Sequence, residues 1–513
     1  MLKFRWSYVP PLLIYLSAGI SGITSIVGIF FLKDYLNISA AFIASIGFWA
    51  GIPWALKMPV GFLIDRFWNQ KHIFVYVGAV LIAISLFIMY YLLANRLLME
   101  TYLSAEFWYI ISTILTPIGY VLQDVVADAM TVEAVDPNFK SNYKNDNSFN
   151  SSIIKEEHTI VQLYGRFAII LGSLIVGLIN LYMFSGLDQS METINTIYAN
   201  IYLIAIIIPF ISVSGVFISR IRNKNIIMQT TFTVQKLDYQ IFLGSFFFVI
   251  FAIFLGTLKF PFSREIVLIT SLILISIIMR LLIKNLDKTQ KNTILGTSII
   301  IFVYRALPGP GAGLNWFEID VLNFDQSFFS LLSVISAAIT LIGMLVFKKF
   351  MVDTALAKLF VILSILSAIL YIPSMLLYYE VHKITSIITH GIVDAKFIAI
   401  LNTAAESPLS QVAMIPLLAW IAKNAPVKYK ATFFAVFASF TNLALSAKEL
   451  FTSYLNKIFI IKREIIDKET NNIIEAANYA YLDSLIISVI IITLFIPLIT
   501  IMIIQKSKFK SLD

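Results

Sequence analysis

The chain has 513 residues, of which 59% are hydrophobic and 13% are charged, and its mean hydropathy is +0.86. Soluble domains are about 45–50% apolar and about 25% charged, so this composition excludes an ordinary soluble protein and indicates a polytopic membrane protein. The absence of cysteine excludes disulfides, thiolate metal sites and cysteine nucleophiles. The histidines show no metal-ligand spacing, and the net charge of +8 lies in short loops, so we expect no cofactor, no metal and no nucleic acid.

In chain order, apolar segments recur with roughly the 20 residues that a bilayer crossing requires. They predict about fourteen transmembrane helices, at residues 10–32, 41–64, 73–94, 105–132, 160–184, 196–218, 241–258, 265–283, 294–320, 328–347, 359–378, 396–422, 431–455 and 482–504. Six helices, an inserted pair and six more suggest two bundles around a central cavity. The predicted segments are an N-terminal six-helix bundle at 1–219, a central linker with two extra helices at 220–293, and a C-terminal bundle at 294–513.

Basic residues predict the orientation. If the N-terminus is cytoplasmic, alternate connecting segments on that side hold about 23 basic residues and those on the other side about 10, so both termini are expected in the cytoplasm. The polar stretch 134–158 is expected to be a flexible cytoplasmic loop. The first apolar run is too long for a signal peptide and lacks its cleavage pattern. We therefore predict a multi-pass protein of a bacterial inner membrane.

A first set of charged residues lies inside apolar segments. Asp124 and Asp128 belong to the run TPIGYVLQDVVADAMTVE at 116–133, and residues four apart lie about 40° from each other on a helix. A charge in this position costs roughly 2.5–3.5 kcal/mol, so it should be paired or hydrated. Lys57 and Arg166 are predicted at similar depth. Two interpretations stay open: a structural charge network at a cytoplasmic gate, or an aspartate that takes up and releases a proton.

A second set lies near the middle of the last six predicted helices and comprises Arg305, Glu406 and the neighbours Lys448 and Glu449. The sequence ALPGPGAGLNW follows Arg305, and its prolines and glycines predict a broken helix. Such a break is either a gating kink without ligand contact or the lining of a cavity. An arginine before the break is a candidate to bind an anionic group, and Trp316 could stack on a flat ring.

Four sequence motifs occur in order along the chain. The segment GIPWALKMPVGFLIDRF contains Lys57 and Asp65, and LQDVVADAMTVE contains both helix aspartates; LNFDQSFFSLLSVISAAITLIG and the stretch 403–446 follow. Together these motifs resemble the folate–biopterin transporter family of the major facilitator superfamily. The resemblance implies the major facilitator fold and proton-coupled uptake of folates, biopterin or related compounds.

The chemistry of a folate then suggests roles for these residues. Arg305 or Lys448 would bind the anionic tail, Glu406 would bind the ring edge or a proton, and Trp316 would stack on the pteridine. The proton-coupling or gating group is expected to comprise Asp124, Asp128, Lys57, Arg166 and Asp65.

Three alternatives stay open. The first is a permease of the same fold for a peptidoglycan fragment, an amino acid or a drug. The second is a membrane-embedded enzyme, although the polar loops at 134–158 and 456–481 contain no recognisable catalytic constellation. The third is a channel, which would not need balanced charges in both halves. We predict a transporter and not an enzyme, with a small molecule, protons and the bilayer as partners, and a monomer.

Overall fold

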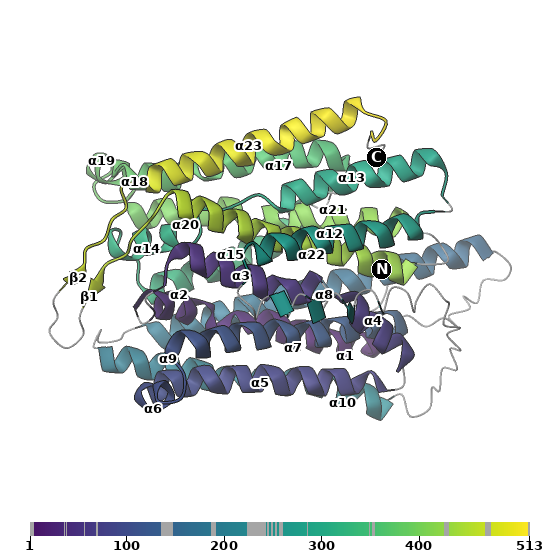
Figure 1. Cartoon of the computed structure of the whole chain (residues 1–513), viewed down its shortest axis with the longest axis horizontal. Coiled ribbons are helices and arrows are strands. Elements are labelled where there is room, and N and C mark those ends of the chain that lie inside the picture. The colour runs from purple at the N-terminus through teal and green to yellow at the C-terminus, as the bar shows by residue number, and fades with distance from the viewer. Residues whose placement is uncertain are drawn as a thin grey trace. The chain divides into compact units, whose positions relative to one another are not determined.

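The computed structural model describes residues 5–510 apart from 35, 37, 56, 68–69, 135–146, 186–190, 285, 348, 351–353, 425–429 and 467–472, and describes only scattered positions of 223–259. It is almost entirely helical (Figure 1). In the described part, nine helical stretches are long and apolar enough to cross a membrane. The predicted all-helical membrane fold is confirmed, whereas the predicted helix at 241–258 lies mostly outside the described residues.

The chain divides into two compact units. Unit 1 comprises Met1–Ser25 and Pro59–Tyr239, and unit 2 comprises Ile26–Met58 and Gln240–Asp513. The second part of the first predicted helix and most of the second predicted helix therefore group with the second half of the chain. The segment boundaries after residues 219 and 293 stay predictions.

Unit 1 is built around α1, which packs against α7, α8 and α10, while α5 packs against α7 and α9. Its elements are η1 (Trp6–Tyr8), α1 (Val9–Ile20), η2 (Ser21–Thr24), α4 (Lys57–Arg66, whose first two residues belong to unit 2), α5 (His72–Ala94), α6 (Arg96–Glu100), α7 (Ala105–Ala134), α8 (Asn147–Phe184), α9 (Met191–Ala205) and α10 (Ile207–Arg222). The polar stretch predicted as a loop is partly helical, since α8 begins at Asn147. Its polar residues continue the helix beyond the apolar segment from which the loop boundary was predicted.

Unit 2 contains α3 packed lengthwise on α22, and α23 packed on α13 and α17. Its elements are α2 (Ser25–Asp34), α3 (Ala40–Ala55), α12 (Ser263–Leu282), α13 (Lys288–Arg305), α14 (Ala312–Asp320), α15 (Gln326–Val346), α17 (Leu356–Leu370), α18 (Ile372–Tyr378), α19 (Val381–Ile388), α20 (Ala395–Glu406), α21 (Leu409–Asn424), α22 (Lys430–Ile458), β1 (Ile465–Ile466), β2 (Ile473–Glu475) and α23 (Leu482–Lys506). The antiparallel pair β1–β2 forms a small hairpin in the segment predicted as a polar loop.

Three long apolar segments of unit 2 are interrupted. The segment 294–320 divides into α13 and α14, 359–378 into α17 and α18, and 396–422 into α20 and α21. Prolines lie at or directly after each interruption. Proline cannot donate the helical hydrogen bond, so the regular helix is interrupted at these positions. Gly311 in the first interruption has a φ of 72°, which a residue with a side chain adopts only with strain. The broken helix predicted from PGPGAG is confirmed.

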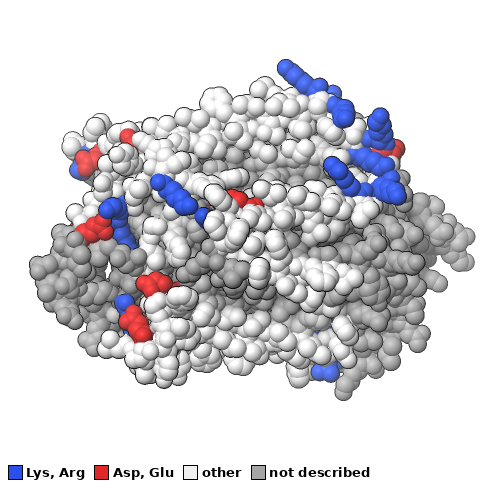
Figure 2. Space-filling model, in the orientation of Figure 1, with Lys and Arg blue, Asp and Glu red and all other residues white. Residues whose placement is uncertain are grey.

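Charge is distributed unevenly over unit 2. Figure 2 shows Lys and Arg gathered at one end, where α12 and α23 end and α13 begins, beside a broad surface without charge. The C-terminal tail contacts the start of α13, since the Thr293 hydroxyl donates to the Lys510 carbonyl over 3.3 Å. At the other end, lysines are paired with glutamates, as in Lys383–Glu380 and Lys462–Glu475. The excess positive charge therefore belongs to one end.

Candidate functional site

Unit 1 contains a polar cluster on three helices. The Tyr15 hydroxyl of α1 donates a 2.5 Å hydrogen bond to Asp128 of α7. Asp124, one turn earlier on α7, and Arg166 of α8 both lie close enough to Tyr15 to interact with it electrostatically. Asp124, Asp128 and Arg166 therefore each interact with a tyrosine that the sequence did not single out, and their gating or proton-coupling role stays a prediction.

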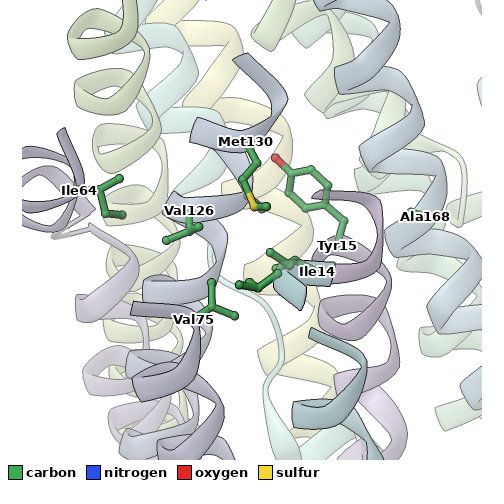
Figure 3. Packing of buried hydrophobic residues seen from close by; sticks show 9 residues of the cluster. Ile14, Tyr15, Ile64, Val75, Val126, Met130 and Ala168 are labelled. Atoms are coloured by element: carbon green, nitrogen blue, oxygen red, sulfur yellow. The ribbon is translucent and has the colours of Figure 1, made fainter. Parts of the chain in front are cut away.

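Packing explains how Tyr15 reaches the carboxylates. A Cβ atom on Gly165 of α8 would lie 2.8 Å from the Tyr15 ring, so the glycine provides the space that the ring fills. Below the hydroxyl, the ring joins an apolar core with Ile14 and Met130 (Figure 3). Packing in this core fixes the position of the ring, so that the Tyr15 hydroxyl donates to Asp128. The cluster therefore holds a carboxylate against a neutral donor, with a cation close enough to interact with that donor.

Lys57 and Asp65 are the other two predicted gating residues. Lys57 belongs to unit 2, is 9% exposed, and places its ammonium 5.1 Å from the centre of the Trp54 ring. The side chain of Asp65 lies outside the described residues. The roles of both residues stay predictions.

The second cluster surrounds the interruption between α13 and α14 in unit 2. The backbone N–H of Gly309 donates to the Thr452 hydroxyl of α22 over 3.1 Å, and the Asn456 side chain donates to the Pro310 carbonyl over 3.2 Å. A Cβ atom on Gly309 would lie 3.8 Å from the Tyr371 hydroxyl and 4.0 Å from Cε of Lys448. Lys448, Thr452 and Asn456 are four residues apart, so one face of α22 follows the irregular backbone.

Arg305 is the last residue of α13. Its Nε donates to the Thr441 carbonyl of α22 over 3.3 Å, and one terminal nitrogen lies 3.3 Å from the Met414 sulfur of α21. These contacts orient the guanidinium, and the fork of a guanidinium matches a carboxylate. Arg305 lies directly before the interruption, as the sequence predicted.

Glu406 is the last residue of α20 and its side chain is exposed. It interacts electrostatically with Lys448, with Tyr371 and with Glu318 of α14. Arg305 also interacts electrostatically with Tyr304, and Tyr304 interacts electrostatically with Tyr371. The polar residues therefore lie around the three helix interruptions, where Lys448 interacts electrostatically with Glu406. Irregular backbone at membrane depth is tolerated where it is buried in protein or lines a cavity.

Trp316 does not belong to this group. It is 2% exposed, packs in a core with Phe317 and Ile461, and the Arg463 guanidinium lies 5.4 Å from its ring centre. Arg463, from the segment before β1, donates to the carbonyls of Leu32 and Leu36 at the end of α2. The position of Trp316 favours a structural role over ring stacking with a ligand.

A salt bridge and a hydrogen bond also connect α2, α14 and the segment after β2. Lys33 of α2 pairs with Asp320 of α14 at 2.6 Å, and the Tyr479 hydroxyl donates to the same carboxylate. Burial and this hydrogen bond raise the pKa of Tyr479 well above its ordinary value. The hairpin segment thus holds α2 and α14 together at one end of unit 2.

Sequence reasoning missed Tyr15, Tyr371, Thr452 and Asn456. Tyrosine, threonine and asparagine carry no charge, so nothing in a hydropathy pattern distinguishes them from residues at an ordinary helix interface. Gly165 and Gly309 offered a sequence signal for these contacts. A glycine within a helix or beside a break often marks a position where another part of the chain approaches the backbone closely.

Several solved structures share this architecture. A POT family transporter solved with 5-aminolevulinic acid superposes with a TM-score of 0.66 at 14% identity, covering 98% of this chain and 96% of the other. The inward-open xylose transporter XylE from E. coli gives a TM-score of 0.51 at 15% identity, covering 98% and 97%. Together with the helix pattern, these similarities show the major facilitator fold.

The particular family follows from sequence. Residues 18–512 match the profile of the BT1 family, and the chain belongs to that family. It is similar to a folate-biopterin transporter of Synechocystis sp., with 19% identity over 86% of this chain and 72% of that protein. It is also 26% identical to folate transporter 2 of Plasmodium falciparum over 32% of this chain and 35% of that protein. The chain is thus a multi-pass transporter of a small molecule and not an enzyme.

Proposed function

We propose that this transporter moves folate-like or pterin-like anions by alternating access, coupled to protons. The observation that carries the proposal is the group at the helix interruptions of unit 2, where Lys448 interacts electrostatically with the exposed carboxylate Glu406 and Arg305 ends the helix before the first interruption. A pteridine presents adjacent N–H donors that a carboxylate can accept, and a glutamate tail presents carboxylates that Arg or Lys can bind. The group therefore matches both ends of such a molecule.

The proton-coupling or gating role is proposed for the cluster of unit 1. Asp128 accepts from Tyr15, and Asp124 and Arg166 lie nearby. A carboxylate with a neutral donor and a cation near it can change protonation as hydration changes. Lys57 and Asp65 stay proposed gating residues.

We also propose an orientation in a bacterial inner membrane with both termini in the cytoplasm. Support comes from the positive end of unit 2, which combines the segments after α12 and after α23. Basic loops are retained on the cytoplasmic side. In this orientation, α3 begins on the outer side.

The test is uptake of labelled folate by right-side-out and inverted vesicles, with and without an imposed pH gradient. We expect accumulation driven by the gradient. Arg305→Gln should raise the half-saturating concentration about tenfold or more, because charge-assisted hydrogen bonds contribute about 1.5–3 kcal/mol. Lys462→Gln, at an exposed hairpin position, serves as the matched loss of a cation and should leave uptake unchanged.

Two results would contradict the proposal. Absence of folate uptake with folded protein in the membrane would exclude this substrate and direct the search to an unbiased metabolite screen. Gradient-driven uptake that persists unchanged in Asp128→Asn would exclude the unit 1 cluster from proton coupling.

A further inference from the structure

The interface between α3 and α22 in unit 2 is an antiparallel contact of small side chains. The Ser453 hydroxyl of α22 donates to the Ala41 carbonyl over 2.9 Å, and the Asn442 side chain donates to the Trp54 carbonyl over 3.1 Å. These two hydrogen bonds hold the opposite ends of the contact. Between them, a Cβ atom on Gly51 would lie 2.5 Å from the Ser446 hydroxyl oxygen, so the helices approach closely.

Glu449 lies in the middle of this interface. A Cβ atom on Gly47 of α3 would lie 3.1 Å from a carboxylate oxygen of Glu449. Among the described residues, the Glu449 carboxylate has no hydrogen bond and no ion pair within 4.0 Å, while Ser453 one turn later is hydrogen-bonded to α3. The glycine leaves room for the carboxyl group but supplies no donor to it.

Neighbouring positions of α22 serve different surfaces. Lys448, Thr452 and Asn456 face the interruption at Gly309, as described above. Ser446, Glu449 and Ser453 follow a second stripe with helical spacing, which faces α3. One rigid helix therefore joins the proposed substrate site to the α3 contact.

We propose that Glu449 is a proton site that couples closure of the α3–α22 contact to protonation. An ionised carboxylate without a donor is costly in a close helix contact, whereas a neutral carboxyl group costs much less. Glu449 is half-buried in this contact, and separation of the helices would hydrate it further and allow it to lose its proton. Protonation thus favours the packed helices, and ionisation favours their separation.

The inference rests on the proposed proton-coupled transport, which it deepens by naming a coupling residue on the helix that contacts the substrate group. The sequence of α3 has no ionisable residue. Among the described residues, the titratable or charged groups on α22 and on the elements packed against α22 or α3 are Lys448, Tyr454 and Lys457 on α22, Arg264, Glu265 and Arg280 on α12, Lys288, Lys291, Tyr304 and Arg305 on α13, and Glu318 and Asp320 on α14. Arg264 donates to Ser45 and Ser453, and Tyr454 donates to Glu265. The Glu449 carboxylate lies against Gly47 of α3.

The test measures the contact directly. The chain has no native cysteine, so Ser45→Cys with Ser453→Cys, whose hydroxyl oxygens lie 3.1 Å apart, reports the α3–α22 contact by disulfide formation in membranes. Ser85→Cys with Ser112→Cys is the control pair within unit 1, with oxygens 2.7 Å apart. Dividing the first rate by the second removes the pH dependence of thiol oxidation.

We expect this rate ratio to rise at least about threefold from about pH 8 to about pH 5, as a titrating group shifts the population of the packed state. Glu449→Gln should make the ratio high and independent of pH, whereas Glu449→Asp should keep the dependence. If the rate ratio of the parent pair, which retains Glu449, does not change with pH, the proposal is overturned. The same pH profile in Glu449→Gln as in the parent pair would overturn it as well.

Transport separates this inference from the proposed function. Glu449→Gln should exchange labelled folate across vesicles but lose accumulation driven by a pH gradient. If the parent protein does not transport folate, the substrate proposal fails while the cross-linking result still decides the role of Glu449. If the parent protein transports folate and Glu449→Gln still accumulates folate in response to the pH gradient, Glu449 has no coupling role. The proposed substrate would then be unaffected.

Discussion

Removal of the Arg463 guanidinium should destabilise the protein strongly, although the residue lies far along the chain from the helix that it binds. Arg463 is 6% exposed and donates to two carbonyls at the end of α2, those of Leu32 and Leu36. Hydrogen bonds to charged groups contribute about 1.5–3 kcal/mol each, and a cation at a helix C-terminus contributes about 0.3–1 kcal/mol more. Arg463→Gln should therefore lower the free energy of unfolding by about 3–7 kcal/mol.

The neighbouring residue supplies the control. Lys462 pairs with Glu475 at 2.5 Å on an exposed surface, and such pairs contribute about 0–1 kcal/mol. Lys462→Gln removes the same charge one position earlier, so the two variants differ mainly in burial and in their partners. Both should be measured by thermal unfolding in detergent and by denaturant titration of the purified protein.

We expect a large loss of stability for Arg463→Gln, an intermediate loss for Arg463→Lys, and almost none for Lys462→Gln. Lysine keeps the charge but cannot reach two carbonyls with a planar fork. Equal unfolding midpoints for Arg463→Gln and Lys462→Gln would refute the argument that the hairpin segment stabilises the end of α2.

Three further predictions concern packing and the unit 1 cluster. Gly19→Ala should strongly reduce the yield of folded protein, because its Cβ would lie 2.0 Å from a backbone carbonyl of α8, whereas Gly22→Ala has open space and should be tolerated; comparing monodisperse protein after detergent extraction checks both. Gly311→Ala should destabilise by about 1–3 kcal/mol, since φ is 72° there, and a midpoint equal to that of Gly22→Ala would contradict this. Tyr15→Phe should lower stability by about 1.5–3 kcal/mol through loss of the hydrogen bond to Asp128, and should lose this effect in an Asp128→Asn background in a double-mutant cycle.

Hydropathy and motif order were enough to predict the membrane class, the family and the fold. These features depend on local composition, because a bilayer crossing requires an apolar run of fixed length. The break after Arg305 was also predictable, since proline and glycine act on their own backbone whatever surrounds them.

The contents of each site depended on distant contacts. Asp124 and Asp128 were conspicuous because charge is rare in apolar segments, but Tyr15, which donates to Asp128, lies 113 residues away and resembles any aromatic residue of a helix interface. Trp316 was selected because it follows the break, yet tertiary packing places it in a core beneath Arg463. Proximity in sequence did not predict on which face of a short helix the ring would lie.

The sequence by itself determined that this chain is a helical membrane transporter and where charge is placed inside its apolar segments, because both follow from residue type along the chain. Only the tertiary structure decided which groups lie next to each charged side chain. It grouped residues 26–58 with the second half of the chain and placed Glu449 against Gly47 of α3. The physical reason is that the energy of a buried charge depends on the donors and solvent around it, and those are supplied by helices that the chain brings together only when it folds.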